Sequence, residues 1–291
     1  IYACRDKHGL RPLSIGRLGD GWVVSSETCA FEVVGAEFVR DVAPGEVVII
    51  DANGLQSVDY SKFKHYNMCA MEYVYFARPD SDIENVNVHS FRKETGRMLY
   101  EEYPVDADIV VGVPDSSLSA AIGYSEASGI PYELGLIKNK YVGRTFIQPS
   151  QELREKGVRM KLSPVHSIVD GKRIVLVDDS IVRGTTSRRI VKMLRQAGAK
   201  EIHLRIASPA ITSPCFYGVD ISTYDELICA GKDGKERARE IIGADSLEWL
   251  SPEALFRAAG DRHELCIACF TGHYPTALYQ SVYDANKDKK F

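Results

Sequence analysis

The sequence contains no apolar run long enough to span a bilayer and no excess of positive charge. Its 36 Lys and Arg residues are outnumbered by 40 Asp and Glu residues, which gives a formal net charge of −4. Nothing therefore indicates a membrane-embedded protein, or nucleic acid or an anionic membrane surface as a partner. The chain begins with Ile-Tyr-Ala-Cys-Arg and has neither an initiator Met nor a signal peptide at that end. Because these residues enter a strand pattern partway, we expect a fragment of a longer protein.

Cysteine is also scarce, with seven residues spread widely over the 291 positions. A secreted disulfide scaffold is shorter and denser in cysteine, and its cysteines are usually even in number. We therefore expect a reducing compartment, the cytoplasm, and a metal or cluster site. With 45% hydrophobic and 26% charged residues, the composition is that of a globular protein, and the length allows one large domain or two.

What the sequence does contain is organised around residues 174–187. Four consecutive apolar residues at 174–177 predict a fully buried strand, and two carboxylates, Asp178 and Asp179, follow directly. A glycine and a group of hydroxyl residues then open a helix that ends at Gly198. The helix is indicated by apolar residues at helical spacing: Ile190, Val191, Leu194 and Ala197.

This strand–loop–helix has the chemistry of an anion site. Backbone N–H groups at a helix N-terminus point at a phosphate, and Gly184 has no Cβ to keep the backbone away from it. The carboxylates of Asp178 and Asp179 have the wrong charge for a phosphate, but they suit ribose hydroxyls, Mg²⁺ or a developing positive charge. Simple helix capping would explain one Asp and one Thr, but it does not explain the acidic pair together with the Arg-Gly-Thr-Thr-Ser sequence.

The stretch closely resembles the phosphoribosyl-diphosphate (PRPP) loop of type I phosphoribosyltransferases. The resemblance implies that Asp178 and Asp179 contact the ribose hydroxyls and Mg²⁺. It also implies a set of residues that bind PRPP around its 5-phosphate: Ser180, Arg183, Gly184, Thr185, Thr186 and Ser187.

Further strands and helices alternate around this motif. Residues 108–114 and 200–207 read as buried strands, and helices are expected near residues 88–99 and 119–127. This order predicts an α/β fold with a mostly parallel sheet and helices on both faces, in which ligands bind at the carboxyl ends of the strands. Ser116 follows such an end, and the family resemblance makes it a ligand of the metal–diphosphate. A role in the N-terminal cap of the next helix is equally compatible.

The N-terminal part has a different pattern. Residues 21–26 and 46–51 read as antiparallel strands, and the aromatic residues at 63–79 predict another strand ending at Pro79. Taken alone, the segment from Arg5 to Leu13 and the Ser25-Ser26-Glu27 segment indicate ordinary turns. With the PRPP motif they resemble the second half of the N-terminal-nucleophile glutaminase domain found in the glutamine PRPP amidotransferase family. The family's cysteine nucleophile is absent from this chain, so no glutaminase activity is expected.

Residues 138–161 are polar and basic, which is typical of a solvated loop. Beside a diphosphate site such a loop can also close over the substrate and stabilise the leaving group. Its sequence resembles the flexible catalytic loop of the same family, which implies catalytic roles for Lys138, Tyr141 and Arg144 in a segment that runs to Gln148.

Cys266 and Cys269 form a C-x-x-C pair, which alone is compatible with zinc, a redox pair or an iron–sulfur cluster. Cys69 and Cys215 match cluster ligands of the iron–sulfur subgroup of the amidotransferase family. The resemblance implies a 4Fe–4S cluster held by these four thiolates, with structural Zn²⁺ as the alternative. Cys4, Cys29 and Cys229 are most simply buried apolar residues.

The resemblance covers nearly the whole chain. It implies that residues 1–62 end a glutaminase domain, residues 63–245 form a phosphoribosyltransferase domain, and residues 246–291 form a helical tail with cluster ligands. The implied reaction makes 5-phosphoribosylamine from PRPP and glutamine-derived ammonia in purine biosynthesis, with purine nucleotides as feedback inhibitors and a dimer or tetramer as the assembly. Two alternatives are another type I phosphoribosyltransferase and a non-catalytic PRPP or nucleotide sensor.

Overall fold

The computed structural model describes residues 1–139, 162–221, 223–231, 233–261 and 264–286. These residues divide into two units. Unit 1 contains residues 1–92, 211–230 and 252–291, and unit 2 contains residues 93–210 and 231–251. Each unit is described separately below.

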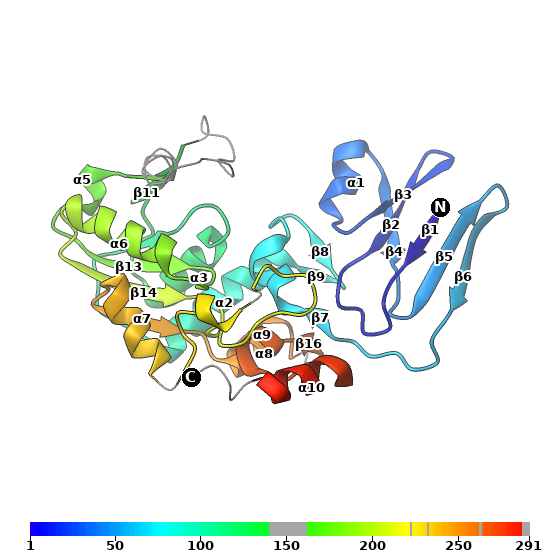
Figure 1. Ribbon diagram of the computed structural model, residues 1–291. Helices are drawn as coiled ribbons and strands as arrows, with labels where there is room; N and C mark the ends of the chain where they lie inside the picture. The colour runs from blue at the N-terminus through cyan, green and yellow to red at the C-terminus, as the bar shows by residue number, and fades with distance from the viewer. Residues whose placement is uncertain (140–161, 222, 232, 262–263, 287–291) are drawn as a thin grey trace, which may run out of the picture. The chain divides into compact units, whose positions relative to one another are not determined.

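Unit 2 is built on a parallel four-stranded sheet (Figure 1). Its strands, in spatial order, are β10 (Ile109–Gly112), β13 (Arg173–Asp178), β14 (Glu201–Ile206) and β15 (Ser246–Trp249). Residues 174–177 of β13 are completely buried, as expected for a central strand covered on both faces. The strands predicted at residues 108–114, 174–177 and 200–207 are thus confirmed.

Helices cover both faces of this sheet. Helix α6 (Thr185–Gln196) connects β13 to β14, and α7 (Gly234–Ile242) precedes β15. Each connection leads to the next strand in the same direction across the sheet. From β10 it passes through α3 (Leu118–Ser128) to a parallel bridge at Tyr132, on the other side of β10. Because parallel crossovers are right-handed, α3 lies on the face opposite α6 and α7. The α/β fold with helices on both faces is therefore confirmed.

Helix α2 (Val88–Glu102) crosses α3 at two glycines. A Cβ at Gly96 would lie 1.8 Å from the carbonyl oxygen of Ala120, and one at Gly123 would lie 1.8 Å from that of Lys93. The two backbones are therefore in direct contact, which side chains at these positions would prevent. This contact holds α3, the helix that follows the Ser116 loop, against α2. The short elements α5 (His166–Val169), β11 (Leu136–Lys138) and β12 (Leu162–Pro164) complete the described part of unit 2.

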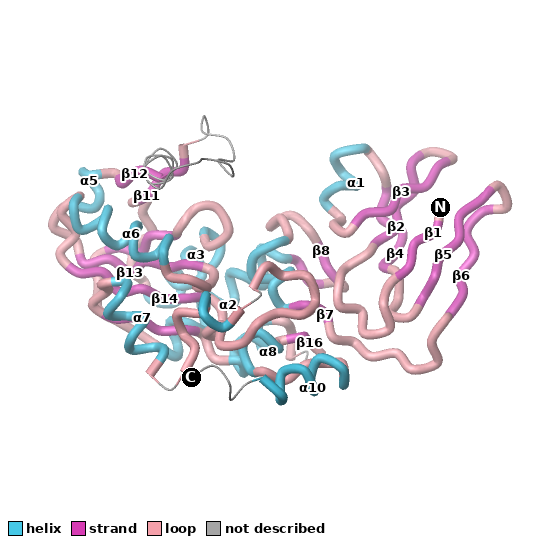
Figure 2. The backbone as a smooth tube through the Cα atoms, in the orientation of Figure 1, coloured by secondary structure: helices cyan, strands magenta, loops and turns pink. Residues whose placement is uncertain are grey.

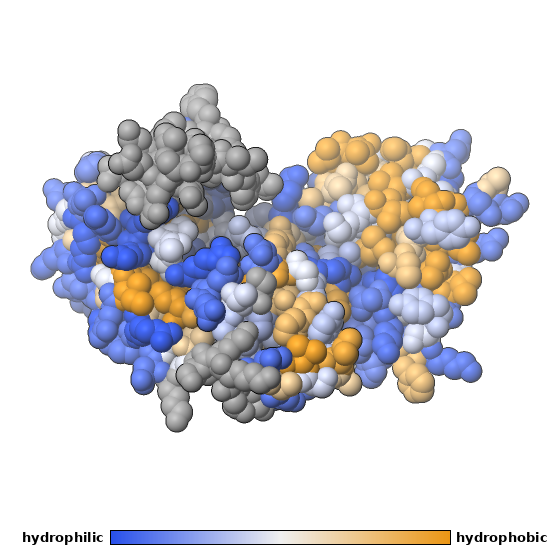
Figure 3. Space-filling model, in the orientation of Figure 1, coloured by the Kyte–Doolittle hydropathy of each residue, from blue (hydrophilic) through white to orange (hydrophobic). Residues whose placement is uncertain are grey.

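Unit 1 contains two antiparallel three-stranded sheets. One consists of β1 (Tyr2–Cys4), β5 (Glu46–Asp51) and β6 (Gly54–Asp59), and the other of β3 (Gly21–Ser25), β2 (Ser14–Leu18) and β4 (Glu37–Asp41). The strands predicted at residues 21–26 and 46–51 are confirmed. Side chains from both sheets share one core: Ala3, Ile15, Val42, Val48 and Ile50. The short helix α1 (Cys29–Val34) carries exposed Val33 and Val34, and Figure 3 shows apolar residues gathered over this part of the surface.

The strand predicted over residues 63–79 is wrong. Only β7 (Met68–Cys69) is a strand there, and the aromatic run forms a π-helix, η1 (Glu72–Phe76). Residues 68–74 are all buried, whereas a strand with one solvated face would expose every second side chain. The buried Arg92 stabilises the end of η1 by donating to the carbonyl oxygens of Tyr73 and Ala77. The aromatic side chains were therefore misleading: Tyr73 and Tyr75 would share one face of a strand, but tertiary packing buries Tyr73 and leaves Tyr75 exposed.

The remaining elements of unit 1 bring the chain back to β7 (Figure 2). Strand β16 (Leu265–Cys266) pairs in parallel with β7, so that Cys266 is the register partner of Cys69. Short elements accompany it: β8 (Asp82–Ile83), β9 (Val86–Asn87), η2 (Tyr224–Glu226), α8 (Pro252–Ala258), α9 (Ala268–Thr271) and α10 (Ala277–Asn286). Within the described residues, no helix is both long and apolar enough to cross a bilayer.

Candidate functional site

The carboxyl edge of the parallel sheet carries the acidic pair. Asp178 is the last residue of β13 and is 7% exposed, and Asp179 follows it and is 8% exposed. Burial, together with the neighbouring charge of Asp179, raises the pKa of Asp178 well above its usual range. The backbone N–H of Asp179 donates to the Asp178 carboxylate at 3.0 Å, and the Ser180 hydroxyl donates to the Asp179 carboxylate at 2.6 Å. Two carboxylates held together in this way are suited to a divalent cation.

The loop after β10 reaches the same edge. The Ser116 hydroxyl donates to Oδ2 of Asp179, so a side-chain hydrogen bond joins the loops that follow β10 and β13. The peptide bond between Pro114 and Asp115 in this loop is cis. Ser117 is the residue at the N-cap of α3, and its hydroxyl donates to the Val113 carbonyl. Ser116 therefore lies with the acidic pair, as its predicted metal role requires.

Helix α6 begins at the predicted anion site. Gly184 occupies its N-cap with φ +70°, a left-handed conformation that glycine adopts without strain. Side chains make no capping hydrogen bond there, so the first N–H groups of the helix are available to an anion. Arg183, Thr185 and Thr186 are exposed beside this N-terminus, and the Ser187 side chain is buried. The predicted PRPP-binding residues are thus gathered around one helix N-terminus.

The basic segment is described only at its beginning. Lys138, the last residue of β11, forms an ion pair with Asp115 of the β10 loop. This places one predicted catalytic cation beside the loop that carries Ser116. Tyr141, Arg144 and Gln148 lie outside the described residues.

The four predicted cysteine ligands all lie in unit 1, in β7, the loop after residue 210, β16 and α9. Burial raises the pKa of Cys69 to about 12 and that of Cys266 to about 11. It also raises that of Cys269, to which the charges of Cys69, Cys266 and Cys215 contribute. The thiols are therefore near enough to interact electrostatically, and all seven cysteines are free thiols. Of the other three, Cys29 and Cys229 are buried as expected, whereas Cys4 is exposed, so the expectation is wrong for Cys4. Within the described ranges, no group of three or more His, Cys, Asp and Glu side chains is close enough to hold a single metal ion.

The environment of Cys266 is apolar and aromatic. Cys266 packs in one core cluster with Ala268 and Tyr274, and partly buried side chains cover that cluster: Leu10, Phe216, Tyr217, Tyr279 and Tyr283. Among the aromatic residues, Phe216 stacks on Tyr279 with 5.2 Å between ring centroids. Such surroundings exclude water, as the shell of a buried metal–thiolate site does.

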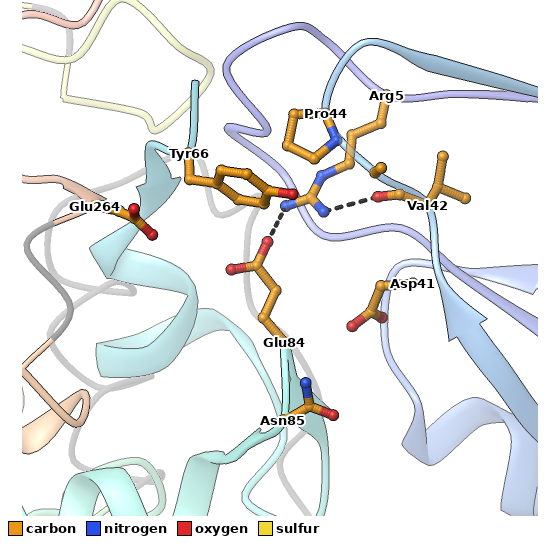
Figure 4. A pocket seen from close by; sticks show the side chains of 9 residues that line it. Arg5, Asp41, Val42, Pro44, Tyr66, Glu84, Asn85 and Glu264 are labelled. Atoms are coloured by element: carbon orange, nitrogen blue, oxygen red, sulfur yellow. Dashed lines mark hydrogen bonds and ion pairs between the residues drawn. The ribbon is translucent and has the colours of Figure 1, made fainter. Parts of the chain in front are cut away.

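Unit 1 also contains a polar pocket of about 460 Å³ (Figure 4). Arg5 forms its inner wall and donates hydrogen bonds to the Val42 carbonyl at 2.8 Å and to Glu84 at 2.6 Å. In Figure 4 the Tyr66 ring points toward the Arg5 guanidinium, and Glu264 lies farther from Arg5. Because the Arg5 side chain is only 3% exposed and donates to acceptors in several loops, it organises the loops of this unit.

A protein-family model, the phosphoribosyl transferase domain, matches residues 94–208. An amidophosphoribosyltransferase of Bacillus subtilis (strain 168) is 61% identical over 282 residues, which are 95% of this chain and 59% of the relative. Another, of Staphylococcus aureus (strain MRSA252), is 54% identical over 98% of this chain and 58% of the relative. A solved structure, of glutamine PRPP amidotransferase from B. subtilis complexed with ADP and GMP, matches with a TM-score of 0.89 at 60% identity. That match covers 96% of this chain and 62% of the solved one.

The parallel sheet, the acidic pair and the family model define a type I phosphoribosyltransferase fold in unit 2. With relatives of 54–61% identity along nearly its whole length, the chain belongs to the amidophosphoribosyltransferase family. It spans slightly more than half the length of these relatives.

Two polar contacts of the site escaped the sequence analysis. Lys138 and Asp115 are 23 positions apart, and Arg11 and Glu72, beside the cysteines, are 61 apart. No local spacing signals such pairs, since each depends on how loops from different strands meet. The Arg-Pro-Leu sequence at residues 11–13 was visible, but it indicated only a turn.

Proposed function

We propose that this chain carries the phosphoribosyl-transfer site of a glutamine PRPP amidotransferase. The site would form 5-phosphoribosylamine from PRPP and ammonia, the first committed step of purine biosynthesis. The observation that carries the proposal is the buried pair Asp178 and Asp179 directly before the uncapped N-terminus of α6. An acidic pair for the ribose and metal beside an anion site for the 5-phosphate is what a phosphoribosyl group requires.

In the proposed reaction the nitrogen lone pair of ammonia forms a bond to C1 of the ribose. The bond from C1 to the diphosphate oxygen breaks, and the diphosphate leaves with that electron pair. The product ammonium group then loses a proton to solvent. Positive charge develops on the ribose during this exchange, and the carboxylates of Asp178 and Asp179 are fixed where they stabilise it. Ammonia is nucleophilic without help, so no general base is assigned.

The other residues bind and enclose the substrate. Gly184 and the hydroxyl residues at 185–187 bind the 5-phosphate, with Ser180 and Arg183 beside them. Lys138 begins the basic segment in which Tyr141 and Arg144 are proposed to close over the diphosphate and exclude water.

The acidic pair fits Mg²⁺. The pKa of Asp178 is raised because two carboxylates share a buried site, and a divalent cation relieves that repulsion. Asp178, Asp179 and Ser116 offer the oxygen ligands that Mg²⁺ prefers. When bound, Mg²⁺ would neutralise charge on the diphosphate.

We also propose that Cys69, Cys215, Cys266 and Cys269 bind one 4Fe–4S cluster with a structural role. Four free cysteines from distant parts of the sequence lie near enough to interact electrostatically, and three of them are buried. Metal binding would hold Cys69, Cys266 and Cys269 as thiolates despite their raised pKa values. A zinc ion needs all four sulfurs at 2.3 Å from one point, whereas a cluster accepts more widely spaced ligands. The cluster is proposed first because the four positions match the ligands of the iron–sulfur subgroup, and structural zinc is the alternative.

The remaining assignments follow the family. Residues 1–62 are proposed as the end of a glutaminase domain, residues 63–245 as the transferase domain, and residues 246–291 as the tail that carries cluster ligands. Purine nucleotides, which the solved relative binds as ADP and GMP, are proposed as inhibitors. Exposed Val33 and Val34, at 72% and 51%, support a dimer or tetramer or the packing of further chain over α1. Seven free thiols suit the cytoplasm.

The transferase proposal is tested by diphosphate release from PRPP with saturating ammonium and Mg²⁺. The wild-type chain is expected to release diphosphate, and Asp178→Asn with Asp179→Asn is expected to lose orders of magnitude in rate while remaining folded. Asp106→Asn, at an exposed carboxylate, is the matched control. Normal turnover by the double variant would exclude the assignment. PRPP binding without any release would indicate a sensor, and release only with a purine or pyrimidine base would indicate a different phosphoribosyltransferase.

A further inference from the structure

We propose that Arg11 is the positioning residue of the four-cysteine site. Its guanidinium links two of the segments that carry the cysteines and supplies a positive charge beside their thiolates. This inference rests on the proposed metal site, and it concerns a residue that lies far from every cysteine of that site in the sequence.

The backbone around Arg11 is already attached to one ligand segment. Arg11 lies in the loop between β1 and β2, and the N–H of Cys69 donates to the carbonyl oxygen of Leu10 at 3.0 Å. The buried Arg5 donates through Nε to the carbonyl oxygen of Arg11 at 2.9 Å. The position from which the Arg11 side chain extends is therefore fixed relative to Cys69.

The Arg11 side chain divides its hydrogen bonds between two ligand segments. Nη1 pairs with the carboxylate of Glu72, in the π-helix directly after β7, and Nη2 donates to the carbonyl oxygen of Tyr217 at 3.0 Å. The N–H of Tyr217 in turn donates to the sulfur of Cys215 at 3.3 Å. Tyr217 thus connects the Arg11 guanidinium, whose hydrogen bond its carbonyl oxygen accepts, to the sulfur of Cys215, to which its N–H donates.

The guanidinium also lies closely over the loop that carries Cys215. A Cβ at Gly218 would be only 3.3 Å from Nη2 of Arg11. The other face of the Arg11 side chain is covered by Phe76, with 5.7 Å from Cζ to the ring centroid. Two separate acceptors in a fixed fork need arginine, since a lysine ammonium cannot reach both in the same geometry.

This arrangement has the form of an outer-shell interaction at a metal site. Such partners orient the ligands and tune the metal, and their loss typically costs about 10- to 100-fold in metal affinity. The third segment, with Cys266 and Cys269, is already held to Cys69 through the β16–β7 pairing. The N–H groups of Thr212 and Ser213 join the Cys215 segment to the carbonyl oxygen of Cys269. Arg11 adds a direct connection between the Cys69 and Cys215 segments, and its charge opposes the repulsion among the thiolates.

Unit 1 offers a matched control in Arg40. Its guanidinium pairs with Glu46 at 2.7 Å, and the Arg40 side chain is 36% exposed compared with 35% for Arg11. The acidic partners are both largely buried, with side-chain exposures of 4% for Glu46 and 12% for Glu72. Replacing Arg40 therefore removes a similar ion pair without touching a cysteine segment.

The experiment compares the wild-type chain with Arg11→Met, Arg11→Lys and Arg40→Met after anaerobic purification. Iron, sulfide and zinc are measured per chain, and then the rate of metal loss to a chelator. For an iron-loaded protein the reduction potential is also measured. Arg11→Met should lose metal about 10-fold faster or more and have a lower potential, because the positive charge that favours the reduced cluster is gone.

Arg11→Lys should keep a potential near that of wild type while losing metal faster, because it retains the charge but not both hydrogen bonds. Arg40→Met should match wild type in both measurements, even if urea unfolding shows a similar loss of stability. If Arg11→Met does not fold, Arg11→Lys decides through its rate of metal loss. If the metal-loaded Arg11 and Arg40 variants lose metal at equal rates, the role of Arg11 is refuted but the metal site is not. A wild-type chain without iron or zinc would overturn the metal site and this inference with it.

Discussion

Replacing Gly96 by alanine is expected to destabilise unit 2, although alanine is the better helix former. Helix propensity alone favours alanine over glycine inside a helix by about 1 kcal/mol. At Gly96, however, the added Cβ would lie 1.8 Å from the oxygen and 2.6 Å from the carbon of the Ala120 carbonyl. Carbon and oxygen atoms normally stay at least about 3.3 Å apart, so α2 and α3 would have to separate by more than about 1 Å.

Overpacking of this kind typically costs about 1–3 kcal/mol. The obstacle here is backbone, which cannot rotate away, so the cost should be at the upper end of that range. Subtracting the gain in propensity leaves a net loss of about 2 kcal/mol in the free energy of unfolding. Gly123→Ala should behave alike, since its Cβ would meet the Lys93 carbonyl oxygen at the same distance.

The measurement is urea unfolding followed by circular dichroism, with exposed Glu101→Ala in the same helix as the control. That control should change the unfolding free energy by no more than about 0.5 kcal/mol. Gly96→Ala should also lower ammonium-dependent turnover, because a displaced α3 moves the Ser116 loop. A Gly96→Ala protein that is more stable than wild type by about 1 kcal/mol would refute the reasoning, because propensity would then be the only effect.

Three further outcomes are expected. Asp178→Asn should raise the melting temperature at pH 7 without Mg²⁺. Burial raises the pKa of Asp178 in the folded state above its ordinary 3.8, so this carboxyl group lowers the stability of the fold as pH rises above 3.8. Equal melting temperatures of the variant and wild type at pH 7 would contradict this expectation. Glu46→Gln should cost about 1–3 kcal/mol at pH 7, as judged by urea unfolding. Burial raises the pKa of Glu46, but hydrogen bonds from Arg40, Ser57 and the Ala43 N–H together outweigh it and lower that pKa to about 2. The difference from wild type should therefore shrink as pH falls from 4.5 toward 2, and a pH-independent difference would argue against these contacts. Cys266→Ser should lose the bound metal, measured as metal per chain, whereas exposed Cys4→Ser should retain it; equal metal content would remove Cys266 from the site.

Local pattern was a good guide to unit 2. The apolar run at 174–177 predicted β13, and the actual strand, Arg173–Asp178, differs by one residue at each end. The helix expected near residues 119–127 is α3, Leu118–Ser128. These elements are recognisable because a strand buried on both faces and a helix with one apolar side have distinct periodicities. Since the carboxyl ends of parallel strands share one edge, the placement of Ser116 with Asp179 was also predictable.

Residues 68–76 show where pattern failed. Aromatic residues favour strands in general, yet this run forms a π-helix in which Glu72, Tyr73 and Val74 are buried and Arg92 donates to the Tyr73 carbonyl oxygen. Intrinsic preference is weak compared with the burial of several large side chains, and burial is decided by distant parts of the chain.

By itself, therefore, the sequence determined the α/β order, the acidic pair, the glycine at the helix N-terminus and which cysteines were candidates as ligands. The first three depend on neighbours within a few positions along the chain, and so does the C-x-x-C pair, whereas Cys69 and Cys215 became candidates through the family resemblance. Only the tertiary structure decided that Cys69 is the register partner of Cys266, that Gly96 and Gly123 bring two backbones into contact, and that Arg11 reaches both Glu72 and Tyr217. These contacts join residues separated by as many as 206 positions, and no local spacing encodes which of many compatible partners will meet.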